Sequence, residues 1–139
     1  MTSYLTLYDR ALSKITDPTL AMLPEEDLEN MLYGWLMSAI AKMRKCSSDL
    51  TNRDDKAKQF NTDLTDIEQE IIAILMTREW LAPQLMSVLT TSQVFSGKET
   101  KFYAQANHLN ELQMLDERLK IEAQQLSRDY TYANNDYFD

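Results

Sequence analysis

The sequence contains little cysteine, glycine, proline or histidine, and each scarcity argues against a class of structure. A single cysteine, Cys46, rules out an internal disulfide and gives no support for an oxidising compartment. Two glycines and three prolines supply few turn signals, so a fold of many short strands is not expected. No apolar run reaches the roughly 18 residues that a membrane span needs, and the opening segment, MTSYLTLYDRALSKI, does not resemble a signal peptide. We therefore expect no membrane partner and assembly in the cytoplasm.

Basic residues are also in the minority. The chain carries 22 acidic and 14 basic side chains, which gives a net charge of −8 and a pI near 4.6. Because proteins bind nucleic acid mainly by neutralising phosphates with Lys and Arg, a general nucleic-acid binder is not expected. An acidic surface can nevertheless line a path along which DNA passes without adhering.

The residue types that carry catalysis are equally scarce. His108 is the only histidine, so neither a zinc site nor the paired E-x-x-H motifs of a di-iron bundle can be assembled. The sequence also lacks the G-x-S-x-G and G-x-x-x-x-G-K motifs. His108 is better interpreted as a packed or surface residue of a helix. We therefore expect a protein that is not an enzyme, without catalytic residues, a cofactor or a metal.

Four segments show helical periodicity, which predicts an all-α fold: a small bundle of about four helices. Apolar residues recur at three- and four-residue steps in each segment, and the expected helices cover residues 3–15, 24–45, 65–91 and 98–128. Ser3 is suited to cap the first helix. Thr65 and Glu68 have the spacing of a capping box at the start of the third. Pro83 predicts a kink or break in that helix near Leu81.

A long polar segment, residues 46–63, separates the second and third helices. Its sequence, CSSDLTNRDDKAKQFNTD, has no periodic pattern and only two large apolar residues, Leu50 and Phe60. Loops of this length in compact domains are usually functional or contain some structure of their own. Two interpretations stay open: a solvated loop pinned by these two residues, or an interaction loop. Trp80, beside the expected kink, is likewise either a core residue or part of a protein interface.

The segment after the last helical stripe is unusual. The bundle is expected to end at Leu126, and residues 127–139, SRDYTYANNDYFD, form a separate extended segment. Its aromatic residues follow neither a helical nor a clean strand period, and disordered segments normally lack aromatics. The segment therefore either packs back on its own bundle or binds a partner. Its candidate partner-binding residues are Arg128, Tyr130, Tyr132, Tyr137 and Phe138.

Four stretches together resemble the head–tail connector (adaptor) proteins of tailed bacteriophages and prophages of Gram-positive bacteria. They are EEDLENMLYGWLMSAIAKMRKC, NTDLTDIEQEIIAILMTREWLAPQL, FSGKETKFYAQANHLNEL and SRDYTY, within residues 25–132. The resemblance lies in the layout of a small helical bundle, an internal excursion and a C-terminal segment that leaves the body.

The resemblance implies a virion structural protein of the phage neck. Subunits of this family form a ring, usually twelvefold, beneath the portal protein, and a stopper or tail-completion protein joins the other side. The C-terminal segment commonly docks on the portal, and DNA passes through the ring without specific binding. The alternative is a cytosolic helical regulatory module that binds one protein partner through the same segment.

Overall fold

The computed structural model describes residues 1–15, 17, 20–43, 48–94 and 99–134, and of residues 88–94, 99–106 and 132–134 only the backbone. The described chain contains four α-helices, so the predicted all-α class is confirmed. The helices are α1 (Tyr4–Ser13), α2 (Glu25–Lys42), α3 (Asp66–Val94) and α4 (Glu99–Asn134). A short 3-10 helix, η1 (Leu20–Met22), precedes α2.

The predicted signals at two helix starts are confirmed. The Ser3 hydroxyl accepts a hydrogen bond from the backbone N–H of Leu5 at 3.2 Å. At the start of α3, the Thr65 N–H donates to Glu68 Oε1 at 2.9 Å, and the Glu68 N–H donates to Thr65 Oγ1 at 3.3 Å. The two residues thus form a reciprocal capping box. Pro24 precedes α2 as its N-cap rather than lying at its first position.

The internal excursion contributes two of the three strands of a small sheet that the sequence did not predict. Strands β1 (Thr2–Ser3), β2 (Arg53–Asp54) and β3 (Gln59–Phe60) pair antiparallel in the order β1-β3-β2. Phe60 pairs with Thr2 on one side and Arg53 on the other. Strands of two residues carry no alternation that a sequence pattern could reveal. The sheet ties the excursion to the first residues of the chain.

Most of the core lies where α1, α2, the first half of α3 and the excursion meet. This first cluster includes Tyr4, Leu7, Leu36, Ile72 and Met76, all fully buried. Leu50 and Phe60 belong to the same cluster, which agrees with a loop pinned by these two residues. Since both are buried, the alternative role as exposed interface residues is not supported by their positions.

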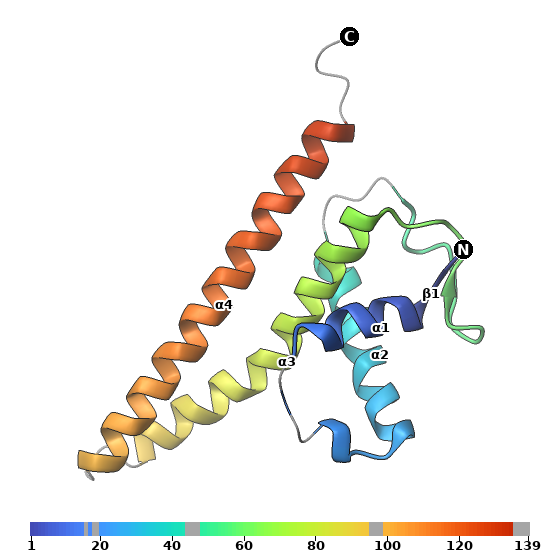
Figure 1. Cartoon of the computed structure of the whole chain (residues 1–139). Coiled ribbons are helices and arrows are strands. Elements are labelled where there is room, and N and C mark those ends of the chain that lie inside the picture. Colours follow the sequence, from blue (N-terminus) through green and yellow to red (C-terminus); the bar gives the residue numbers. More distant parts are fainter. Residues whose placement is uncertain (16, 18–19, 44–47, 95–98, 135–139) are drawn as a thin grey trace.

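The second cluster joins α3 to α4. Its buried residues are Ile74, Leu81, Leu112, Leu119 and Ala123. In Figure 1, α4 runs as one long helix along α3, and α3 changes direction between its green first half and its yellow second half. Of the two predicted outcomes at Pro83, a kink or a break, the structure shows a kink, because α3 continues through Pro83 and changes direction.

Candidate functional site

The site predicted from the sequence lies at the end of α4, and its structure corrects one boundary. Helix α4 does not end near Arg128 but continues through Asn134, so residues 127–134 are helical rather than extended. Tyr130 is only 3% exposed. The division after Leu126 therefore falls inside a helix. The physical reason is spacing: Leu119, Ala123, Leu126 and Tyr130 follow one another at four, three and four residues.

Tyr130 reaches a buried carboxylate on α3. Its hydroxyl donates to Glu68 Oε2 at 3.1 Å, although the two residues lie 62 positions apart in the sequence. Glu68 is only 1% exposed. A buried carboxylate is costly unless donors surround it. The hydrogen bond from the Tyr130 hydroxyl therefore offsets part of the free-energy cost of burying the Glu68 carboxylate.

The other donors to Glu68 come from two further segments. Ser48 donates its backbone N–H to Oε2 at 3.3 Å and its hydroxyl to Oε1 at 3.1 Å. The Thr65 N–H supplies the capping bond to Oε1. We call Glu68, Ser48, Thr65 and Tyr130 the Glu68 cluster. It joins the excursion, the start of α3 and the end of α4 through one side chain.

The sequence contains a signal for the Glu68 cluster in addition to the capping-box spacing of Thr65 and Glu68. The position of Glu68 three and four residues before Ile71 and Ile72, which are both buried, places it on the core side of α3. A capping glutamate on a buried face needs further hydrogen-bond donors, so this spacing indicates a buried polar cluster.

The remaining predicted residues are placed as follows. Arg128 is exposed on α4. Tyr132 lies in α4, but its side chain is outside the described residues, as are Tyr137 and Phe138 altogether. Trp80 is half-buried against the second cluster, and its indole N–H donates to Asp17 Oδ2 at 3.2 Å. Of the predicted docking residues whose side chains are described, Tyr130 faces inward and Arg128 outward.

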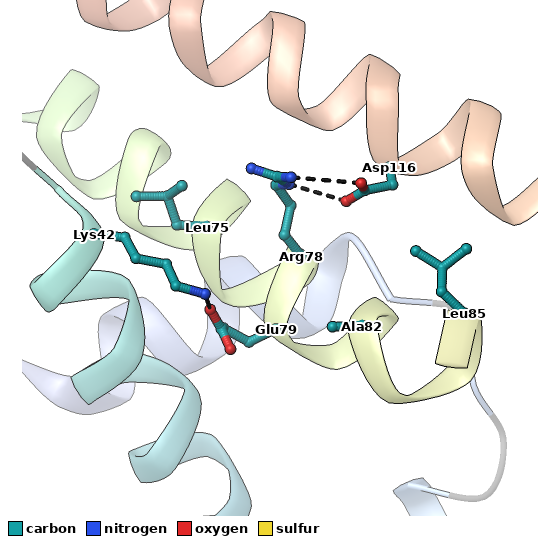
Figure 2. Close-up of a pocket in the computed structure, with 7 residues that line it drawn as sticks. All are labelled: Lys42, Leu75, Arg78, Glu79, Ala82, Leu85 and Asp116. Atoms are coloured by element: carbon teal, nitrogen blue, oxygen red, sulfur yellow. Dashed lines mark hydrogen bonds and ion pairs between the residues drawn. The ribbon is translucent and has the colours of Figure 1, made fainter. Parts of the chain in front are cut away.

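A cleft of about 270 Å³ lies farther along α3, where α2 and α4 approach it. Figure 2 shows Arg78 of α3 facing Asp116 of α4, with Nε–Oδ1 and Nη2–Oδ2 distances of 3.0 and 3.4 Å. On the other side, Lys42 of α2 pairs with Glu79 of α3. Leu75, Ala82 and Leu85 supply apolar lining. The two ion pairs link α3 to both neighbouring helices.

In the described part of the chain, no three His, Cys, Asp or Glu side chains gather in a way that could hold a metal ion. None of the described helices is long and apolar enough to cross a bilayer. No protein-family model, curated protein or solved structure matches the chain.

Proposed function

We propose that this chain is a non-enzymatic structural subunit of the neck of a tailed phage or prophage, a head–tail connector. In this role it forms a ring of its own copies, twelve in the usual arrangement, between the portal protein and a stopper or tail-completion protein. It is assembled in the host cytoplasm and remains in the virion. DNA passes through the ring without specific binding.

The observation that carries the proposal is the fixed end of α4. Because Tyr130 is anchored on Glu68, the chain that follows it departs from a defined point on the body. That chain contains Tyr132, Tyr137 and Phe138. Aromatic side chains dominate the binding energy of many protein interfaces. A subunit whose last helix is fixed on the body at Tyr130, and whose sequence after that residue contains three aromatic residues, is suited to dock on another protein.

The anchored tyrosine changes the role of one predicted docking residue. Tyr130 is buried in the subunit, so we assign it to positioning the docking segment rather than to contact with the portal. The proposed docking residues are then Arg128, Tyr132, Tyr137 and Phe138. The net charge of −8 per copy also supports the proposal, because an acidic ring does not hold the phosphates of passing DNA.

Mass spectrometry of tailed particles from the strain that encodes the chain tests the proposal. We expect the protein in purified particles, and DNA-filled heads without tails when its gene is deleted. Its absence from particles, together with normal tails after deletion, would contradict the proposal. Co-purification with one cytosolic protein and absence from particles would support the regulatory module instead.

A further inference from the structure

We infer that the outward face of α4 is a self-association surface on which a second copy of this chain packs with its α4 parallel. The surface consists of one line of exposed residues at seven-residue spacing: Asn107, Met114, Ile121 and Arg128. Met114 is 68% exposed and Ile121 is 50% exposed. This inference concerns the purified protein in solution and does not rest on the connector proposal.

The position of this line on the helix leaves room for a neighbour. Residues facing α3, such as Leu112 and Leu119, lie on the opposite side of α4 when the turn is about 100° per residue. Figure 1 shows α4 along one side of the molecule, with the body on the other side. A second α4 can therefore approach Met114 and Ile121 without meeting either body.

The charges that flank the line favour a parallel neighbour. Glu117 lies on one side of the Met114–Ile121 line and Arg118 on the other, and both are exposed. A two-fold axis along the helices places opposite flanks together, so Glu117 of each copy meets Arg118 of its partner. An antiparallel pair places the same flanks together and brings glutamate against glutamate. The like-charge contact disfavours the antiparallel arrangement.

The residues along the line also suit an in-register parallel pair. Ile121 packs on Ile121 and Met114 on Met114, while Asn107 faces Asn107. A polar Asn at such a seam position is a known device for fixing register in parallel helix pairs. Arg128 also meets its own copy, and its long side chain can keep the charged head in water. The apolar contact is small, so association should be weak.

A parallel dimer has one functional consequence. A two-fold axis along α4 puts both C-terminal ends at the same end of the dimer. Two copies of the segment after Asn134 would then face a partner together. Paired presentation raises the effective concentration of the second segment once the first has bound.

Cross-linking tests the orientation and register. In a Cys46→Ser background, Ile121→Cys alone should form a disulfide dimer on mild oxidation, because equal positions lie opposite each other. Gln113→Cys, exposed on the neighbouring side of α4, is the control that should not cross-link. If Ile121→Cys joined only to a Met114→Cys partner, about 10 Å along the helix, the pair would be antiparallel and the inference wrong.

Charge reversal tests the contact itself by analytical ultracentrifugation. Glu117→Arg and Arg118→Glu should each raise the dimer dissociation constant at least about tenfold, since each makes two like-charge contacts. An equal mixture of these two variants, or the double variant, should restore dimerisation. Ile121→Asp should also abolish it, without changing the thermal midpoint. A protein that stays monomeric at the highest soluble concentration and forms no Ile121→Cys cross-link would overturn the inference.

Discussion

The Tyr130 hydroxyl donates to Glu68 Oε2 at 3.1 Å, so the end of the last helix is held by a carboxylate buried at the start of α3. The same carboxylate accepts hydrogen bonds from Ser48 and Thr65. Three segments far apart in the sequence thus depend on one side chain. This explains how the end of α4 is held on the body beyond the apolar contacts of Leu112, Leu119 and Ala123.

Removing the Tyr130 hydroxyl should destabilise the protein. Tyr130→Phe deletes one donor to a buried carboxylate, and hydrogen bonds to charged groups contribute about 1.5–3 kcal/mol. We expect the free energy of unfolding to fall by about that amount in urea titrations. The matched control is Tyr8→Phe, because the buried Tyr8 hydroxyl has no hydrogen-bond partner among the described residues. Equal losses in the two variants would contradict a specific role for the Tyr130–Glu68 bond.

Glu68 itself should be among the most sensitive positions. Glu68→Ala removes the capping bond and the acceptor of the hydrogen bonds from the half-buried Ser48 and the buried Tyr130. We expect a loss of about 2–4 kcal/mol in unfolding free energy. Glu122→Ala, on the exposed side of α4, should change it by less than about 0.5 kcal/mol.

A double-mutant cycle separates the free energy of the Tyr130–Glu68 hydrogen bond from the other effects of the two substitutions. If Glu68 and Tyr130 are coupled, Tyr130→Phe should cost much less in a Glu68→Ala background than in the native protein. Additive losses would show that the hydrogen bond between Tyr130 and Glu68 does not contribute to stability.

Acid should weaken the contact between α1 and α3. Burial raises the pKa of Glu70, but hydrogen bonds and charges from Lys14 and Arg10 outweigh it, so the pKa lies below its ordinary value of 4.5. The folded protein therefore releases this proton more readily than the unfolded chain does. The stabilisation is present above about pH 4.5 and is lost as the pH falls through the lowered pKa.

Comparison with Glu70→Gln isolates this effect from the other carboxylates. The native protein should be the more stable of the two at pH 7, and the difference should shrink on acidification below pH 4.5. Urea titrations at several pH values provide the measurement. A difference that is constant or grows towards acid would contradict the assigned role of Glu70.

The helices could be predicted from the sequence because their signals are local. The Ser3 cap, the Thr65–Glu68 capping box and the apolar stripes need only residues a few positions apart. The pairing of Phe60 with Thr2 depends on residues distant in the sequence, and two-residue strands have no period of their own. Such contacts follow only from the packed fold.

The end of α4 was misjudged for a different reason. The buried stripe of α4 runs from Leu119 through Ala123 and Leu126 to Tyr130. Because Ala123 is small and is not a leucine, the pattern of leucines alone does not show that the stripe continues to Tyr130. The aromatic residues after Leu126 were therefore grouped by their type rather than by their spacing. The spacing assigns Tyr130 to the core and separates it from Tyr137 and Phe138.

Two truncations should separate the core part of the C-terminal segment from the part proposed to dock. Deleting residues 127–139 removes Tyr130 and its bond to Glu68, so we expect a loss of about 2–4 kcal/mol or more in unfolding free energy. Deleting only residues 135–139 should leave the thermal midpoint unchanged, because it keeps all of α4. It removes Tyr137 and Phe138, however, and should prevent attachment of tails to heads in a complementation test. Tyr137→Ala with Phe138→Ala should act in the same way, and Gln113→Ala, exposed on α4, should not.

If the short deletion left tail attachment intact, the docking role proposed for Tyr137 and Phe138 would be wrong. If it lowered the thermal midpoint as much as the long deletion does, residues 135–139 would belong to the folded body.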